Sequence, residues 1–124
     1  NRIFQFGIRS GDRTEFLWAK GHINMTKFNF DGLDKVVESL AGKPVYFTID
    51  LDILDPSVFP GTGTPEAGGV TFTELLGAIN KVSRLNIVGC DLNELSPIYD
   101  HSGVSTAVAC KVLRELLLAL RNKQ

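Results

Sequence analysis

Two short apolar runs constrain the fold of this chain more than any other feature of its sequence. One is PVYFTI, from Pro44 to Ile49, and the other is LNIVGCDL, from Leu85 to Leu92. Each run has the length of a strand, and neither alternates strictly between apolar and polar residues. This pattern is typical of strands buried on both faces, which occur almost only in parallel sheets. The two runs therefore predict two buried strands of a parallel sheet.

The segments around these runs predict an alternation of strands and helices. A third strand is expected from Arg2 to Ile8, where β-favouring residues end at a turn. Apolar residues at helical spacing predict four helices, which run from Thr14 to His22, from Asp31 to Gly42, from Thr71 or Thr73 to Ser83, and from Gly103 to Leu120. In the first of these helices, Phe16, Leu17 and Trp18 are expected to face the core. The resulting order of elements favours an α/β layered fold with a mostly parallel sheet.

The size and charge of the chain limit the partners that it is expected to have. Its 124 residues leave room for one domain, and its 44% apolar and 22% charged residues exclude a disordered or low-complexity chain. Lys and Arg total 13 against 14 Asp and Glu, so neither nucleic acid nor a membrane is expected as the main partner. Cys90 and Cys110 lie in apolar stretches, and they are expected to be buried, reduced thiols of a cytosolic protein.

Acidic side chains follow both apolar runs. Asp50 and Asp52 come directly after the first run, and in an extended chain residues i and i+2 point to the same side. Two adjacent carboxylates repel each other unless a cation lies between them, and their hard oxygens suit Mg²⁺ or Mn²⁺. The alternative is that they cap the following turn. The second strand ends at Asp91-Leu92-Asn93-Glu94, and its two acids are either solvated or hold a cationic substrate.

A long loop rich in Pro, Gly and Thr follows the first run, from Asp50 to Gly69. Loops of this length in a compact domain are usually functional. Within it, Asp55 precedes Pro56 and is expected to serve a turn. An Asp-x-Asp motif after a buried strand also occurs in phosphatases of the haloacid-dehalogenase type, with Asp50 as nucleophile and Asp52 as acid and base. An Asp-x-Asp phosphatase is therefore one alternative function for this chain.

The loop and its flanks resemble a known family. The string DLDILDPSVFPGTGTPEAGG, from Asp50 to Gly69, is similar to the third signature of the ureohydrolase family, which comprises arginases and agmatinases. The resemblance continues in LNIVGCDLNELSPIYDHSG and in FGIRSGDRTEF, so it spans essentially the whole chain, and it matches the agmatinase branch best. It implies a three-layer αβα sandwich with a mostly parallel sheet. Residues 1–124 would form the C-terminal part of one such domain.

The resemblance also implies a site and a reaction. Asp50 matches a ligand that bridges two Mn²⁺ ions, and Asp52 matches a ligand of one of them. Glu94 matches a residue that contacts the guanidinium group of the substrate, and Thr64 matches a residue that lines the same pocket. The implied reaction is manganese-dependent hydrolysis of a guanidino C–N bond, most closely that of agmatine to putrescine and urea in polyamine biosynthesis. By the same analogy we expect a small guanidino substrate, a homo-oligomer (trimer or hexamer) and a cytoplasmic location.

Other site segments of the family are absent from these 124 residues. They are a Gly-Gly-Asp-His segment, an Asp-x-His-x-Asp segment and a proton-carrying His, all expected upstream of Asn1, so the chain alone is expected to be inactive. Ser10 and Gly11 match agmatinases, whereas Asp12 falls where arginases have an acid that binds the amino-acid head of arginine. Arginase, another guanidino or formimino hydrolase, and a non-catalytic ureohydrolase-like module therefore remain alternatives.

Overall fold

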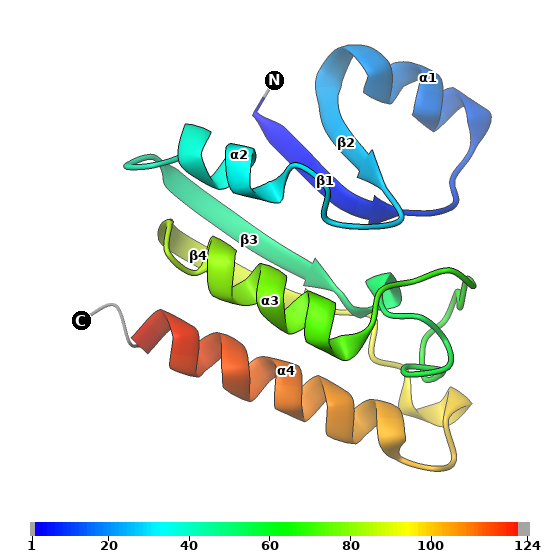
Figure 1. The fold of residues 1–124 in the computed structure, drawn as a ribbon. Coiled ribbons are helices and arrows are strands. Elements are labelled where there is room, and N and C mark those ends of the chain that lie inside the picture. The colour runs from blue at the N-terminus through cyan, green and yellow to red at the C-terminus, as the bar shows by residue number, and fades with distance from the viewer. Residues whose placement is uncertain (1, 122–124) are drawn as a thin grey trace.

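The computed structural model describes residues 2–121, which form four strands, four α-helices and two short 3-10 helices (Figure 1). Their order along the chain is β1 (Ile3–Ile8), α1 (Arg13–His22), β2 (Ile23–Lys27), α2 (Leu33–Ser39), β3 (Pro44–Asp50), η1 (Leu51–Ile53), α3 (Phe72–Val82), β4 (Asn86–Asn93), η2 (Pro97–Tyr99) and α4 (Val104–Arg121). The predicted α/β layering is confirmed, and the four helices and three strands expected from the sequence are all present.

The strands form two parallel pairs rather than one continuous sheet. β1 pairs with β2, and β3 pairs with β4, with Ile3 opposite Ile23 and Thr48 opposite Asp91. Strand β2 was missing from the sequence-based expectation. Its five residues, INMTK, contain three polar side chains and form no apolar run, so their pattern does not distinguish a strand from a loop.

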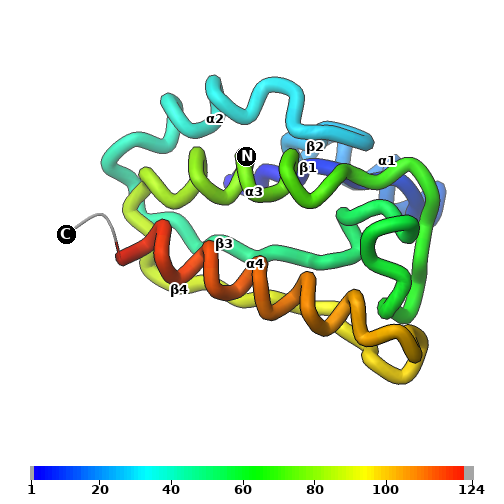
Figure 2. The backbone as a smooth tube through the Cα atoms, turned by 60° about the horizontal axis from the view of Figure 1, so that its bottom comes forward, coloured from blue at the N-terminus to red at the C-terminus, as the bar shows by residue number. Residues whose placement is uncertain are grey.

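Helices α2, α3 and α4 lie side by side along one face of the strands (Figures 1 and 2). The core lies between this helical layer and β3. Its buried side chains come from the end of β3, the loop after it, α3 and α4: Ile49, Leu51, Leu54, Phe59, Val70, Leu75, Ile79, Ala109, Val112 and Leu116. Helix α3 begins with a capping box, in which the side chains of Thr71 and Glu74 each accept a backbone N–H of the other residue. Of the two expected helix starts, Thr71 and Thr73, the structure has Thr71, which caps the helix.

The expectation that β3 and β4 are buried on both faces is wrong for the described chain. Side chains of β3 alternate between exposed and partly or fully buried positions, and Tyr46 and Val88 are 64% and 65% exposed. No described helix covers the second face of this strand pair, which explains the exposure. Cys90 and Cys110 are free thiols but exposed, so their predicted burial is also wrong.

Helix α1 contributes little to the core. Asp12 caps its first turn, and only Ala19 of its ten residues is buried. Leu17 and Trp18 are more than half exposed, against the expectation that they face the core, and Trp18 stacks on the ring of His22 instead. The apolar residues of α1 are adjacent in sequence, so a helix spreads them around its circumference rather than along one face.

Candidate functional site

The chain turns sharply where β3 ends, and a compact loop follows. Asp50 is the last residue of β3, and η1 begins at the next residue. The loop is held down by Leu51, Leu54 and Phe59, whose side chains are almost completely buried. It then returns along itself, because Leu54 forms a parallel bridge with Val70. The tight anchoring places the predicted acidic pair at the carboxyl end of the β3–β4 pair, where ligands bind in open α/β sheets.

Asp52 is held by two threonine hydroxyls from the same loop. The hydroxyl of Thr62 donates to one carboxylate oxygen, and the hydroxyl of Thr64 donates to the other at 2.7 Å. Thr62 is buried, whereas Thr64 is exposed. The expected extended geometry is wrong, because Asp52 lies in the 3-10 turn rather than two residues along a strand. Both oxygens of Asp52 are nevertheless fixed in direction.

Asp50 caps the turn that carries Asp52. Its carboxylate accepts the backbone N–H of Asp52 at 2.9 Å. Partial burial raises the pKa of Asp50, and the nearby Asp52 carboxylate raises it further, while the hydrogen bond from Asp52 and the charge of Arg9 act in the opposite direction. A carboxyl whose charged form is disfavoured in this way gains from a neighbouring cation. The capping role and the cation role are therefore compatible.

Arg9 joins β1 to this turn, a contact that the sequence reasoning missed. Its guanidinium donates to the backbone oxygens of Asp52 and Ile53, the latter at 3.0 Å, across more than 40 residues of sequence. Its Nε is buried and has no partner among the described residues. The only sequence signal was its position in the FGIRSGDRTEF string.

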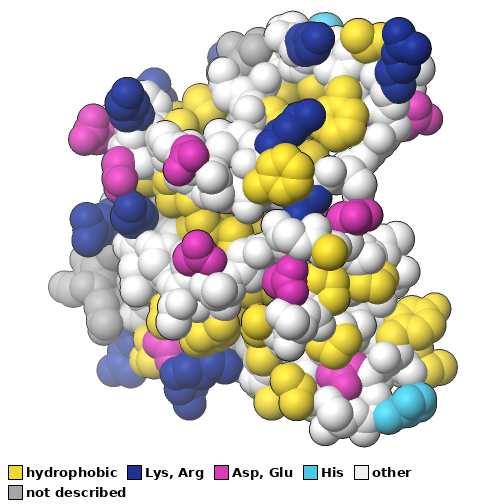
Figure 3. Space-filling model, turned by 45° about the vertical axis from the view of Figure 1, so that its right-hand side comes forward, with side chains coloured by type: hydrophobic (Ala, Val, Ile, Leu, Met, Phe, Trp, Pro, Cys, Tyr) yellow, Lys and Arg dark blue, Asp and Glu magenta, His cyan; other side chains and the backbone are white. Residues whose placement is uncertain are grey.

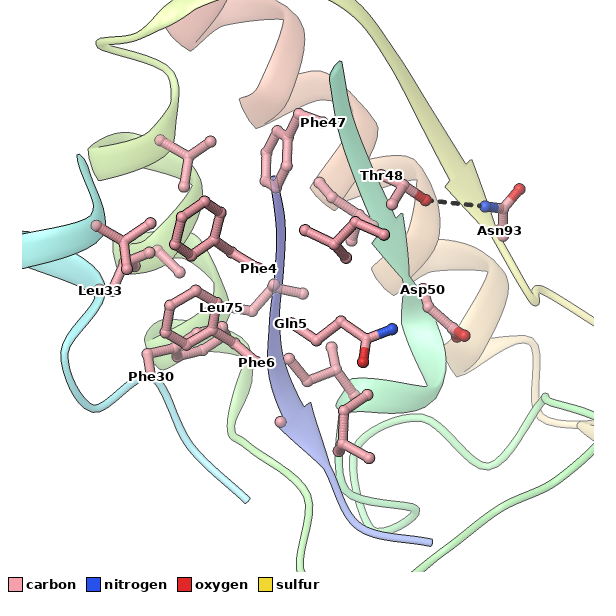
Figure 4. Close-up of a pocket in the computed structure, with 18 of the residues that line it drawn as sticks. Phe4, Gln5, Phe6, Phe30, Leu33, Phe47, Thr48, Asp50, Leu75 and Asn93 are labelled. Carbon is pink, nitrogen blue, oxygen red and sulfur yellow. Dashed lines mark hydrogen bonds between the residues drawn. The ribbon is translucent and has the colours of Figure 1, made fainter. Parts of the chain in front are cut away.

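The four predicted site residues line one cavity of about 890 Å³, together with Arg9. Glu94, which follows β4, has φ 71°, in the left-handed region that residues with a Cβ adopt only at a cost. The cavity extends from this mouth along β3, and Asp50, at the end of β3, is one of the residues that line it (Figure 4). The structure thus brings Asp50, Asp52, Thr64 and Glu94 to the same opening.

Asp91 lies beside the cavity and is held by two residues that line it. Its carboxylate accepts the hydroxyl of Thr48 at 2.6 Å, and Asn93 donates to both of these side chains. The hydrogen bond from Thr48 is the main cause that lowers the pKa of Asp91, followed by that from Tyr46. Asp91 does not line the cavity. Its expected role in holding a cationic substrate is therefore not supported.

Asp55 and Asp100 stabilise the loop through hydrogen bonds to its backbone and hydroxyl groups. Asp55 accepts hydrogen bonds from Ser57, Gly68 and Gly69, which together lower its pKa to about 2. The structural role predicted for Asp55 is confirmed. Asp100 is buried and accepts from Ser102 and from the backbone of Ser105 at the start of α4. The hydroxyl of Ser105 in turn accepts the N–H of Gly61 at 2.8 Å, which ties the loop to α4.

Asp12 has a structural role in α1. Its side chain accepts the N–H of Thr14, and its own N–H donates to Glu15 at 2.9 Å, so the two acids form a capping box. This accounts for an acid at position 12 without any substrate contact.

The described residues do not form a complete metal site. Among residues 2–121, no group of three or more His, Cys, Asp or Glu side chains is placed to hold a metal ion. Asp50 and Asp52 are two hard oxygen ligands at one turn, a donor type that fits Mn²⁺. The oxygen atoms of these two carboxylates suit Mn²⁺ chemically. Two such groups are nevertheless fewer than a tightly bound ion needs.

Comparisons with known proteins agree with this arrangement. The profile described as "Arginase family" matches residues 1–119. Agmatinase of Bacillus cereus is 50% identical over 121 residues, which cover 94% of this chain and 41% of the relative. Human mitochondrial guanidino acid hydrolase is 36% identical over 96% of this chain and 37% of the relative.

A solved structure has the same arrangement of elements. The crystal structure of a candidate agmatinase from Clostridium difficile superposes with a TM-score of 0.93 at 53% identity, covering 99% of this chain and 46% of that one. The chain therefore spans less than half the length of the relatives that it matches. No helix among residues 2–121 is long and apolar enough to cross a membrane.

Proposed function

The chain belongs to the arginase family, and from that premise we propose that it is the C-terminal part of a manganese-dependent guanidino hydrolase that converts agmatine to putrescine and urea. The observation that carries the proposal is the convergence of Asp50, Asp52, Thr64 and Glu94 on one cavity mouth. The activity belongs to a longer protein that contains these residues, because the chain spans about two-fifths of its curated relatives.

Asp50 and Asp52 would hold Mn²⁺ at the mouth. The threonine hydroxyls that hold Asp52 fix the direction of its oxygens, which is what an outer shell of hydrogen bonds does for a metal ligand. Arg9 holds the backbone of the same turn, so the two carboxylates keep their relative positions. When bound, Mn²⁺ would supply Lewis-acid activation of water near neutral pH.

Glu94 and Thr64 would bind and orient the substrate. A guanidinium group is planar, and a carboxylate can accept two parallel N–H donors from it, which fixes both its position and its plane. Glu94 is an exposed carboxylate at the mouth, and its left-handed backbone conformation follows directly after the end of β4. Orientation of this kind places the guanidinium carbon for attack and lowers the entropic part of the barrier.

Agmatine is favoured among the possible guanidino substrates. The B. cereus agmatinase is 50% identical to this chain, compared with 36% for the human guanidino acid hydrolase. Asp12, whose position matched an arginase acid, is engaged in capping α1. The family assignment gives no support to the phosphatase alternative. The proposed reaction yields putrescine, which is consistent with a role in polyamine biosynthesis.

We extend the proposal to location and assembly. Two exposed free thiols, Cys90 and Cys110, are compatible with a reducing compartment, which favours the cytoplasm. The expectation of a trimer or hexamer is an analogy with the family and stays a prediction.

The test is urea release by the full-length protein that contains this chain, assayed with Mn²⁺ on agmatine, arginine, a guanidino acid and formiminoglutamate in parallel. We expect agmatine to have the highest kcat/KM. Glu94→Gln should lower kcat/KM by roughly 30-fold or more, since losing one partner of a charge pair costs about 2 kcal/mol or more. The exposed Glu38 on α2 provides the matched control, Glu38→Gln, which should leave kcat/KM unchanged. Preference for another substrate would reassign the specificity, and no turnover of any would favour the non-catalytic module.

A further inference from the structure

The backbone of Gly61 is bonded to two segments that are distant from it in sequence. Its N–H donates to the hydroxyl of Ser105 at 2.8 Å, and its C=O accepts the N–H of Ser96 at 2.8 Å. Ser105 lies in the first turn of α4, and Ser96 lies two residues after Glu94. Gly61 therefore joins the loop after β3, the segment after β4 and the start of α4 at one point.

The chain segments at this junction are too close together for a side chain at position 61. A Cβ on Gly61 would lie 2.7 Å from the Cβ of Ser105 and 3.0 Å from the Cβ of Asp100. Figure 3 shows this end of the molecule, where the surface is hollowed between the upper and lower halves. Gly61, Thr62 and Ser105 are all buried below the surface. The junction is therefore closely packed and shielded from solvent.

The hydroxyl of Ser105 is itself fixed in direction. The buried Asp100 accepts the backbone N–H of Ser105 at 2.7 Å. Hydrogen bonds from the side chains of Ser102 and Ser105 are the two largest causes that lower the pKa of Asp100. The Ser105 hydroxyl thus donates to Asp100, and its oxygen accepts from Gly61. Because a buried N–H without an acceptor is costly, the position of Gly61 depends on this oxygen.

One consequence of holding Gly61 concerns Asp52. Thr62, the next residue in the loop, donates its hydroxyl to one carboxylate oxygen of Asp52, and Thr64 donates to the other at 2.7 Å. Both threonines lie within three residues of Gly61, so a shift of Gly61 displaces both donors. The direction of the Asp52 carboxylate therefore depends on the bond between Gly61 and Ser105.

The other consequence concerns Glu94. Before Glu94, the chain is held in β4, which ends at Asn93. After Glu94, it is held at Ser96, whose N–H donates to Gly61. Only one residue separates Glu94 from this second anchor, so the placement of the Glu94 backbone also depends on Gly61.

We propose that Ser105 is a positioning residue of the guanidino hydrolase, whose hydroxyl acts through Gly61 to set the positions of Asp52 and Glu94 relative to each other. The inference rests on the proposed function, which assigns Asp52 to the metal ion and Glu94 to the substrate. Ser105 and Gly61 do not line the cavity, so they act through other residues rather than on the substrate. A residue that only stabilised α4 would affect neither metal nor substrate binding specifically.

The test is Ser105→Ala in the full-length protein, which removes the acceptor and adds no atom that collides. We expect Mn²⁺ affinity, measured by titration of the metal-free protein, to fall by about 10-fold or more. At saturating Mn²⁺, kcat/KM for agmatine should also fall by about 10-fold or more, because Glu94 is displaced. Ser83→Ala is the matched control, since Ser83 is a buried serine at the end of α3 whose hydroxyl donates to the C=O of Asn80 at 3.1 Å. It should leave both quantities unchanged.

A double-mutant cycle with Thr62→Val distinguishes positioning from a general loss of stability. If Ser105 acts on the metal ligand through the loop, the two substitutions together should lower Mn²⁺ affinity by less than the product of their separate effects. The fall in kcat/KM at saturating Mn²⁺ should persist in the double variant, because it arises at Glu94. Ser105→Cys, which replaces the hydroxyl by a weaker acceptor of similar shape, should show both losses to a smaller extent.

Four results would overturn the inference. They are unchanged Mn²⁺ affinity or unchanged kcat/KM in folded Ser105→Ala, equal losses in Ser83→Ala, full additivity of Ser105→Ala with Thr62→Val, and, if Ser105→Ala does not fold, a folded Ser105→Cys that behaves like the wild type. These results are distinct from failure of the proposed function. A wild type that binds Mn²⁺ and releases no urea would overturn the guanidino hydrolase assignment, whereas equal turnover by the wild type and Ser105→Ala would overturn this inference alone.

Discussion

At the scale of single residues, hydroxyl and amide donors hold the acidic side chains of the loop in position. Asp52 has a threonine hydroxyl on each oxygen, and Asp55 has hydroxyl and backbone donors from both ends of the loop. Such bonds favour the charged carboxylate and fix its direction. The loop is therefore built to present negative charge at defined positions.

The first prediction concerns Asp55 and pH. Its pKa in the folded chain is about 2, against an ordinary value of 3.8, so its hydrogen bonds contribute stability that is complete above the ordinary value. That contribution is lost as the pH falls through the folded pKa. In urea denaturation at a series of pH values, the difference in unfolding free energy between wild type and Asp55→Asn should shrink from about pH 4 to about pH 2. A difference that stays constant over this range would contradict the account.

The second prediction concerns the buried hydroxyl of Thr62. In the full-length protein, Thr62→Val removes the donor to Asp52 at nearly constant volume. We expect Mn²⁺ affinity, measured by titration of the metal-free protein, to fall by about 10- to 100-fold, as is usual when a partner of a metal ligand is lost. Thr106→Val, at an exposed position of α4, is the control and should bind Mn²⁺ like the wild type. Equal Mn²⁺ affinity of all three proteins would show that the hydroxyl of Thr62 does not contribute to Mn²⁺ binding.

At the scale of elements, the loop after β3 depends on close backbone approach at Gly69. A Cβ there would lie 2.4 Å from the backbone nitrogen of Asp55, which cannot move aside as a side chain can. Gly63, in the same loop, has nothing within 4 Å of the corresponding position. The loop therefore contains a matched pair of glycines, one tightly packed and one free of neighbours.

The third prediction uses this pair. Gly69→Ala should lower the unfolding free energy by about 1–3 kcal/mol or more, because overpacking forces the backbone to shift. Gly63→Ala should change it by no more than about 0.5 kcal/mol. Both substitutions affect the unfolded chain alike, so their difference in denaturation midpoint reports the contact at Gly69. Equal midpoints would mean that the close approach to Asp55 does not constrain the loop.

The strands illustrate what a sequence pattern can and cannot indicate. The apolar runs predict β3 and β4 correctly, because a short apolar run between turn residues is typical of a strand. The five residues of β2 carry no such run, and their strand conformation depends on pairing with β1, a contact that periodicity does not report. Burial of both faces was also inferred from pattern, but burial depends on which layers are present, and the described residues cover one face of β3 and β4.

At the scale of the whole molecule, the site was only partly predictable. Asp50, Asp52, Thr64 and Glu94 follow from strand ends and from a long signature that resembles a family. Arg9 reaches the same turn across more than 40 residues, so its role depends on tertiary placement. The hydrogen bonds that join Asp100, Ser105 and Gly61 also depend on tertiary placement, and no sequence pattern indicates them.

The central claim is that these residues are one part of a composite active site. The most direct measurement is urea release from agmatine with saturating Mn²⁺, comparing the 124-residue chain with the same chain fused behind the unmatched part of B. cereus agmatinase. We predict turnover by the folded fusion protein, its loss in the fusion with Asp50→Asn, and no turnover by the chain alone, because no group of three or more His, Cys, Asp or Glu side chains among residues 2–121 is placed to hold a metal ion. Turnover by the chain alone at a rate comparable to that of the fusion, or a folded fusion that binds Mn²⁺ and releases no urea, would contradict the claim.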